Sequence, residues 1–290
     1  MLVSKDPLKG SQALALTPQQ HRTEFLKLFR QTARHRHRYD VFRDFVTLAA
    51  CTMHNGIFQS FSIEAWPKIA QEREDEFIKI RGSYDKQDQD AFPMLFAHLV
   101  GMLDPEPRDI LGPLYMELEV ASKDQGQFFT PPELSELMAR LSYGPELANL
   151  RKPFVTVGEP ACGAGGMVLA FVKVMIENKL DPSRRLWTQC IDVDRLAALM
   201  CYVQLSLWNV PGEVIVGNSL SWEIREVWYT PAHTLGLWNI RLKRQASEAE
   251  NALQIQEDEE TNGFDPASPP PEPKPLPASD VQPMQLGFDF

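Results

Sequence analysis

Apolar residues recur at helical spacing through the first third of the chain. Thr17 and Pro18 give a capping residue followed by a proline, which is typical of a helix start. We therefore expect a flexible leader over residues 1–17 and a mostly helical N-terminal domain over residues 18–122. The expected helices cover residues 18–54, residues 64–103 with a break near Gly82, and residues 110–120.

The pattern changes after Gly126, where short apolar strands alternate with apolar-periodic helices. The expected order is strand 154–157, helix 167–176, strand 186–191, helix 194–207 and strand 214–216. Such alternation is typical of a parallel, doubly wound sheet with right-handed crossovers. The predicted fold class is therefore α/β, with a Rossmann-like sheet over residues 123–240 that stops near its fourth strand.

Composition changes again beyond residue 240. Residues 241–260 are charged and predict a helix, whereas residues 261–290 are acidic and rich in proline, which predicts disorder. Residues 246–290 hold ten acids and one lysine, so most of the formal net charge of −10 belongs to this tail. The remaining body is nearly neutral, and residues 1–45 carry nine bases against four acids. A neutral body with a basic end can bind nucleic acid, which a uniformly acidic protein usually does not.

The sequence also excludes several classes of protein. It has no apolar run long enough to span a membrane and no apolar secretory core at its start. Its four cysteines are widely separated, without a C-x-x-C pair, which argues against a disulfide framework and a zinc site. We therefore expect a cytoplasmic protein that has no membrane partner and no metal.

A glycine-rich motif, E-P-A-C-G-A-G-G, fills residues 159–166 at a strand-to-helix turn. Glycines there let the backbone approach a ligand closely, and the helix N-terminus favours an anionic group. The dinucleotide fingerprint G-x-G-x-x-G is excluded because Val168 replaces its third glycine. In addition, Asp192 follows Gly163 by 29 residues, and that fingerprint places its acid about 20 residues on. A phosphate-binding P-loop is excluded because no Gly-Lys-Ser/Thr follows.

A second motif, G-Q-F-F-T-P, occupies residues 126–131, ahead of the glycine-rich motif. In this order the two motifs resemble G-x-F-[YF]-T-P and D-P-A-C-G-S-G-G of the modification subunits of type I restriction–modification systems. Those subunits are S-adenosylmethionine-dependent adenine-N6 DNA methyltransferases with a helical N-terminal domain. The resemblance covers residues 111–220 and implies a methyltransferase sheet, S-adenosylmethionine as cofactor and DNA as substrate.

The resemblance implies that the first motif and the start of the second hold the methionine part of the cofactor. Thr130 would donate to its carboxylate, with Phe128 and Phe129 closing the pocket. Glu159 would lie near its ammonium group, and Ala161 belongs to the same binding loop. The structural alternatives are that Phe128 and Phe129 are core aromatics and that Thr130 caps a helix.

The resemblance also implies contacts to the rest of the cofactor. Gly163 and Gly165 would let the backbone pass beside the methionine part. Asp192 would accept from both ribose hydroxyls, and Val193 would lie against the adenine ring. Asn218 stands where the family usually has aspartate, so it keeps a carbonyl acceptor for the adenine amine but loses the charge. The structural alternative is that Asp192 is a strand-end turn residue.

The catalytic tetrapeptide of adenine-N6 methyltransferases, [NDS]-P-P-[YFW], is missing. Its oxygens accept from the adenine amine and its ring stacks on the flipped base. The nearest strings, T-P-P-E at residues 130–133 and S-P-P-P at residues 268–271, belong to the cofactor motif and the tail. Tyr229 is the candidate stacking ring, with His233 as a second divergent substitute, and an ordinary loop is the alternative. We therefore expect weak or absent methylation by the isolated chain.

Three further features concern partners. A sheet that stops near its fourth strand leaves an edge that a homodimer, a protein partner or residues 222–258 must cover. The Arg-His run at residues 34–38 is either a contact to DNA phosphates or a solvated helix face, and its two histidines alone do not indicate a metal. Residues 285–290, Q-L-G-F-D-F, resemble the short peptides that dock on the bacterial sliding clamp.

Together these observations predict an S-adenosylmethionine-binding protein of the adenine-specific DNA methyltransferase family, of the restriction–modification type. The alternative is a catalytically degenerate or partner-completed relative that binds cofactor, DNA and protein. The missing tetrapeptide is the feature that favours the alternative.

Overall fold

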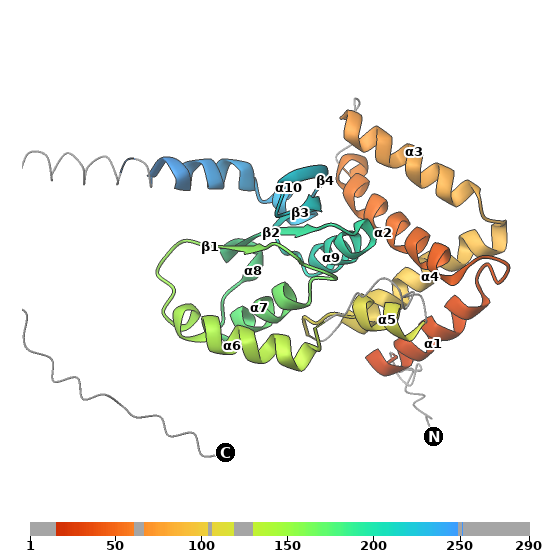
Figure 1. Cartoon of the computed structure of the whole chain (residues 1–290), viewed down its shortest axis with the longest axis horizontal. Coiled ribbons are helices and arrows are strands. Elements are labelled where there is room, and N and C mark those ends of the chain that lie inside the picture. Colours follow the sequence, from red (N-terminus) through yellow and green to blue (C-terminus); the bar gives the residue numbers. More distant parts are fainter. Residues whose placement is uncertain (1–15, 61–66, 104–105, 119–129, 249–250, 252–290) are drawn as a thin grey trace, which may run out of the picture. The chain divides into compact units, whose positions relative to one another are not determined.

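The computed structural model describes residues 16–60, 67–103, 106–118, 130–248 and 251 (Figure 1). The chain up to Arg241 forms one compact unit, and a second unit begins at Leu242. Within the second unit, residues 242–248 are helical, inside the range where a charged helix is expected. The expected proline-rich tail and all but the last two residues of the expected leader lie outside the described residues.

The N-terminal region is helical, as the apolar pattern predicts. Thr17 and Gln20 form a capping box at its start: the Thr17 hydroxyl accepts from the Gln20 N–H, and the Gln20 side chain accepts from the Thr17 N–H. The break expected near Gly82 separates the third helix from the fourth. The helices are α1 (Pro18–Gln31), α2 (Arg38–Ser60), α3 (Lys68–Gly82), α4 (Lys86–Leu103) and α5 (Leu111–Glu117).

Residues 18–54 do not form the continuous helix that their periodicity suggests. A turn separates α1 from α2, and Ala33 within it adopts a left-handed φ of 45°. The Ala33 N–H donates to Asp88 Oδ1 at 2.8 Å, so a carboxylate from α4 holds the turn. Both helices bury an apolar face, so apolar residues keep their helical spacing on either side of the turn. The apolar pattern alone therefore does not show where α1 ends.

The core of the helical region is aromatic. The rings of Phe25 and Phe29 stack with centroids 6.1 Å apart, and the Phe45 ring meets Phe25 edge-on at 5.6 Å. Phe42 contacts Phe29 at 6.0 Å and Tyr115 of α5 at 5.8 Å. These rings are fully buried or nearly so, and the four phenylalanines are those that the helical spacing places on inward faces.

A mixed, mostly parallel sheet of four strands follows among the described residues, which confirms the α/β class. Its order is β1-β2-β3-β4; β1, β2 and β3 are parallel, and β4 is antiparallel to β3. From β1 to β3 the strands advance in one direction, as they do in one half of a doubly wound sheet. The elements are α6 (Pro132–Ala148), β1 (Val155–Glu159), α7 (Gly166–Glu177), α8 (Pro182–Arg185), β2 (Leu186–Asp192), α9 (Arg195–Leu207), β3 (Gly212–Asn218), β4 (Glu223–Tyr229) and α10 (Pro231–Leu235).

Strand β4 corrects the expectation of a loop around Tyr229. It pairs with β3 from Glu213 to Asn218 and covers the outer edge of that strand. A Cβ built at Gly217 would lie 2.4 Å from the Glu223 carbonyl oxygen, so this glycine is needed for the close strand pairing. At the other end of the sheet, β1 pairs only with β2 among the described residues.

Charged contacts join the helical region to the α/β region within the first unit. The Arg73 guanidinium of α3 lies over the Trp228 ring of β4, 3.6 Å from its centroid. Arg195 of α9 forms an ion pair with Glu76 of α3 at 2.9 Å. The domain boundary predicted at residues 122–123 falls outside the described residues.

The four cysteines are unpaired and buried. In the described part of the chain, no group of three or more His, Cys, Asp or Glu side chains is placed to hold a metal ion. No helix among these residues is long and apolar enough to cross a membrane.

Candidate functional site

A hollow of about 440 Å³ lies at the carboxyl ends of β1, β2 and β3. Ligands of open α/β sheets bind at this end of the strands, and the volume is that of a small-molecule site. We call it the strand-end hollow. Its lining residues are Pro160, Ala161, Gly163, Asp192, Val193, Ala197, Gly217, Asn218, Ser219 and Leu220. The lining thus brings together the predicted cofactor residues Ala161, Gly163, Asp192, Val193 and Asn218.

The loop between β1 and α7 is shaped by two left-handed glycines. Gly163 has a φ of 52° and Gly165 a φ of 92°, and Gly165 is the N-cap of α7. The loop is tied down by the Cys162 N–H, which donates to the Ile191 carbonyl at 2.9 Å, and by the Gly165 N–H, which donates to the Cys162 carbonyl at 2.8 Å. A Cβ at Gly165 would lie 3.0 Å from Cys201 Sγ. Glycine is therefore required at Gly165 by packing beneath the loop as well as by backbone angle.

Asp192 joins the end of β2 to this loop. Its Oδ2 accepts from the Gly163 N–H at 2.8 Å, and its Oδ1 accepts from the Asp194 N–H at 2.9 Å. Burial raises the pKa of the Asp192 carboxyl above its usual value, although these backbone hydrogen bonds oppose the shift. A carboxylate offers about four acceptor positions, so each oxygen can still accept from a ligand hydroxyl.

Glu159 and Asn218, the predicted residues at the ends of β1 and β3, are also engaged by backbone. Glu159 Oε1 accepts from the Ala161 N–H at 3.2 Å, and burial raises the pKa of its carboxyl. Asn218 Oδ1 accepts from the N–H groups of Leu220 and Ser221, at 2.9 and 3.3 Å. The side-chain carbonyl predicted to meet the adenine amine therefore already stabilises the turn after β3.

The first motif is only partly described. Thr130 is exposed just before α6 and is not among the residues that line the strand-end hollow. The Pro131 carbonyl accepts from the N–H groups of Leu134 and Ser135, at 3.0 and 3.1 Å, in the first turn of α6. Phe128 and Phe129 lie outside the described residues, so their place in the pocket stays a prediction.

Comparison with known proteins identifies this region. Residues 107–233 match the family model N-6 DNA Methylase. This segment belongs to the N-6 DNA methylase family. The chain is also similar to the solved structure of a protein assigned as a class I S-adenosylmethionine-dependent methyltransferase from Listeria monocytogenes, with 16% identity and a TM-score of 0.34. The match covers 66% of this chain and 51% of the other, so it spans about half the length of the Listeria protein. No curated protein matches the chain significantly.

Within the methylase-family segment, Tyr229 does not meet the strand-end hollow. Tyr229 pairs with Glu213 near the start of β3, whereas the hollow lies at Asn218 at its other end. At about 3.3 Å per residue, this separation is roughly 17 Å along the strand. The Tyr229 ring lies 4.5 Å from the ring of His233, which is buried and accepts a hydrogen bond from Trp187 Nε1 at 3.0 Å. His233 therefore has a packing role here.

Trp222 is the aromatic residue that the sequence analysis missed. It lies in the turn between β3 and β4, 73% exposed, with a left-handed φ of 56°. Ser219 and Leu220 of the same turn line the strand-end hollow, and Trp222 lines an adjoining depression that shares Asn218 with it. Apolar periodicity carries no signal for an exposed ring in a turn. The one local sign of Trp222 is its place just after residues 217–220, G-N-S-L, which contain Asn218.

A buried polar network beneath the methylase loop was also missed. Gln204, fully buried on α9, donates from Nε2 to the Ala164 carbonyl at 2.7 Å and to Asp109 Oδ1 at 2.9 Å. Its Oε1 accepts from the Ile110 N–H at 2.7 Å, and Asp109 Oδ1 accepts from the Gly112 N–H at 2.9 Å. Burial raises the pKa of the Asp109 carboxyl. The network fixes the glycine-rich loop against the start of α5.

Proposed function

We propose that the protein binds S-adenosylmethionine in the strand-end hollow and serves the transfer of its methyl group to the N6 amine of adenine in DNA. The observation that supports this most is the meeting of Gly163 and Asp192 in a hollow of small-molecule size inside an N-6 DNA methylase segment. A half-buried carboxylate beside a left-handed glycine loop suits a ligand that combines a ribose with an amino acid.

The residues present fit this cofactor. The open acceptor positions of Asp192 suit the two ribose hydroxyls, and Val193 is 63% exposed and free to lie against the adenine ring. Gly163 leaves room for the methionine part, and the Glu159 carboxylate is the partner for its ammonium group. S-adenosylmethionine supplies an electrophilic methyl group when bound. The other residues proposed for this site are Phe128, Phe129, Thr130, Ala161, Gly165 and Asn218.

Methyl transfer also needs acceptor oxygens aimed at the adenine amine and a surface for the flipped base. Trp222 is better placed for stacking than Tyr229, because it follows the turn that lines the hollow and is largely exposed. The Asn218 carbonyl, which would have to accept from an amine, is occupied by its own turn. We therefore propose that the chain holds the cofactor and is a weak methyltransferase alone.

The unpaired edge of β1 favours a second function, that of a partner-completed subunit. Among the described residues β1 pairs only with β2, so the backbone groups of its other edge are open to a strand from a protein partner or a second copy. Such a partner would supply the missing base clamp. The clamp-like peptide at residues 285–290 lies outside the described residues, and binding to the bacterial sliding clamp remains a prediction.

Calorimetry with S-adenosylmethionine tests the cofactor proposal. Asp192→Ala should weaken binding about 10-fold or more, because it removes hydrogen bonds to a charged acceptor worth about 1.5–3 kcal/mol. Asp181→Ala is the matched control, since Asp181 accepts from a backbone N–H at 2.9 Å at the start of α8, away from the strand-end hollow. Its affinity should equal that of the unchanged protein. A folded protein that shows no binding at millimolar cofactor contradicts the proposal.

Transfer of a tritiated methyl group to mixed-sequence DNA tests the reaction itself. We expect little incorporation by the purified chain and a clear gain when it is purified with co-expressed neighbouring proteins. Robust incorporation by the chain alone contradicts the partner-completed form. Cofactor binding without incorporation under either condition leaves a degenerate cofactor-binding module.

A further inference from the structure

A second hollow, strongly basic, lies at the turn between α1 and α2. Its volume is about 500 Å³. We call it the arginine hollow. Its lining residues are Arg30, Arg34, Arg36, His37, Arg38 and Leu118, without a carboxylate. Four guanidinium groups around one hollow give it a positive potential that favours an anion.

Arg38 is fixed by neutral acceptors. Its guanidinium donates to the carbonyls of Phe29 at 3.1 Å, Thr32 at 2.9 Å and Arg36 at 3.1 Å, and also to that of Ala33. These carbonyls lie at the end of α1 and in the turn that follows, where a cation is favoured. None of these acceptors is a carboxylate, and the Asp88 carboxylate that holds Ala33 acts on Arg38 only through space.

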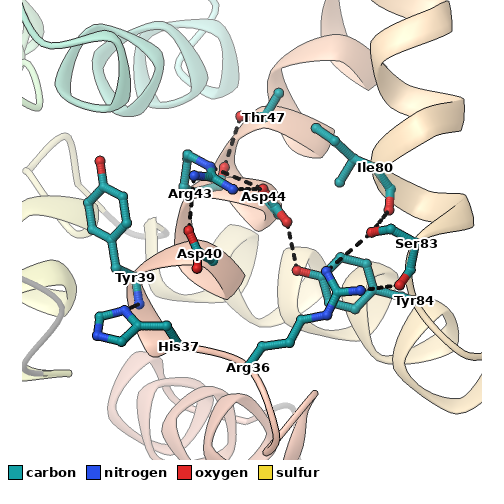
Figure 2. A network of polar contacts seen from close by, with 10 residues as sticks. All are labelled: Arg36, His37, Tyr39, Asp40, Arg43, Asp44, Thr47, Ile80, Ser83 and Tyr84. Atoms are coloured by element: carbon teal, nitrogen blue, oxygen red, sulfur yellow. Dashed lines mark hydrogen bonds and ion pairs between the residues drawn. The ribbon is translucent and has the colours of Figure 1, made fainter.

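Arg36 is fixed in a similar way by Ser83 and Tyr84, which follow α3 (Figure 2). Its guanidinium lies over the Tyr84 ring, 3.9 Å from the centroid, and donates to the hydroxyl of Ser83 at 3.2 Å and to the Ser83 carbonyl. The two carboxylates of this network have other partners: Asp44 accepts from the Tyr84 hydroxyl at 2.8 Å and pairs with Arg43 at 3.0 Å, and Asp40 also pairs with Arg43 at 3.0 Å. Neither carboxylate pairs with Arg36.

Arg30 and Arg34 complete the hollow as open groups. Both are exposed, and within the described residues neither has a hydrogen bond or an ion pair. The left-handed backbone of Ala33, held by Asp88, sets the direction in which Arg34 leaves the helix end. A guanidinium fork matches the geometry of a phosphate, and open forks beside fixed ones make a preformed phosphate site.

The arginine hollow and the strand-end hollow share no lining residue, but Tyr39, next to the first, lies near enough to Asp194, next to the second, to feel its charge. Tyr39 follows Arg38 directly, and burial together with the nearby Asp194 carboxylate raises the pKa of its phenol. The same carboxylate and Tyr39 also act on Tyr115. Asp194 stands two residues beyond Asp192, which lines the strand-end hollow.

We propose that the arginine hollow binds phosphates of the DNA backbone and so positions the duplex beside the strand-end hollow. The choice of DNA among polyanions rests on the proposed function. Arg36 and Arg38 supply fixed charge, and Arg30 and Arg34 close on the phosphates. Such contacts fix register and orientation without reading sequence.

The test measures binding of a fluorescent mixed-sequence duplex by anisotropy, without cofactor, between about 50 and 200 mM salt. The double variant Arg30→Ala/Arg34→Ala should lose about 10-fold or more in affinity, and its log–log salt slope should fall by about 1 to 2, since each phosphate contact adds about 0.9. Arg30→Lys/Arg34→Lys should keep most of the slope. The matched control, Arg151→Ala/Arg184→Ala, removes two exposed arginines elsewhere and should change affinity less than twofold.

Equal losses in the test and control variants, or no loss in either, overturn the proposal. Displacement of the duplex by inorganic phosphate or polyglutamate at matched charge concentration also overturns it, because the site is then a general anion site or binds an acidic peptide. Calorimetry with S-adenosylmethionine on the same variants separates the two proposals. If the cofactor fails to bind while duplex binding depends on Arg30 and Arg34, the proposed function fails and the arginine hollow stands.

Discussion

Replacing Gly165 with alanine tests how the glycine-rich loop is built. Two costs add. The φ of 92° is strained for any residue with a Cβ, by about 1–2 kcal/mol, and the new methyl would lie 3.0 Å from Cys201 Sγ and 3.4 Å from Cys201 Cα. Overpacking of this kind costs about 1–3 kcal/mol. We therefore expect Gly165→Ala to lower the free energy of unfolding by about 2–5 kcal/mol.

A double-mutant cycle separates the two costs in urea denaturation. Cys201→Ala removes the sulfur, so in that background Gly165→Ala should cost only about 1–2 kcal/mol, the backbone part. Gly158→Ala in β1, just before the motif, is the control, because nothing lies within 4 Å of its Cβ and it should shift stability by less than about 1 kcal/mol. A cost below about 0.5 kcal/mol for Gly165→Ala would refute the whole argument. An unchanged cost in the Cys201→Ala background would refute its steric half.

Three further predictions concern charge and catalysis. Burial beside Arg73 lowers the pKa of His54 to about 4, so its neutral form adds stability above pH 6.5 that is lost as the pH falls toward 4. The unfolding free energy should fall by about 2–3 kcal/mol more between pH 7 and pH 4.5 in the unchanged protein than in His54→Phe, and equal falls would contradict this. Arg73→Ala should cost about 2–4 kcal/mol in urea denaturation, through its lost ring contact and its lost hydrogen bond to a buried carbonyl, whereas Lys68→Ala on the exposed side of α3 should cost almost nothing. In any preparation that methylates DNA, Trp222→Ala should lower turnover about 5- to 150-fold and Tyr229→Ala less than twofold, without change in cofactor affinity; the reverse order would show that the base lies at the other end of β4.

The parts of the fold that follow from local chemistry were predictable. The strand expected at residues 186–191 is β2 at Leu186–Asp192, and the helix expected at residues 194–207 is α9 at Arg195–Leu207. These segments are buried and strongly apolar, so their period and length decide the element. Phe25 and Phe29 of the helical region recur at helical spacing, and both are fully buried.

Features that depend on contacts distant in sequence were not predictable. The break after α1 depends on Asp88, a residue of α4 that no local pattern connects to Ala33. Strand β4 has exposed positions on both faces through its first half, so no alternation marks it, and its pairing is set by β3. The distance of Tyr229 from the strand-end hollow follows directly, because the antiparallel strand β4 ends opposite Glu213, near the start of β3.

The candidate site shows the same division between motif and context. The glycine-rich motif and Asp192 were found from spacing and resemblance, and the structure brings them within one hydrogen bond of 2.8 Å. Gln204 belongs to no recognisable motif, and a single glutamine in an otherwise apolar helix does not by itself indicate a buried polar contact. Only the structure shows its role, because its side chain forms hydrogen bonds with Ala164, Asp109 and Ile110 at the same time.

The Gln204 network also explains why the helical region and the sheet act as one unit at the site. A buried carboxamide with three hydrogen-bond partners stabilises one position of the loop relative to α5. Any other position would leave a buried polar group without a hydrogen bond, which costs free energy. Its partners lie in the glycine-rich loop and at the start of α5, and Tyr115 of α5 contacts Phe42 of α2. These contacts therefore connect the loop with α2, whose first residue is Arg38 of the arginine hollow. This chain of contacts gives a physical route by which occupancy of the strand-end hollow can influence the phosphate site that we propose.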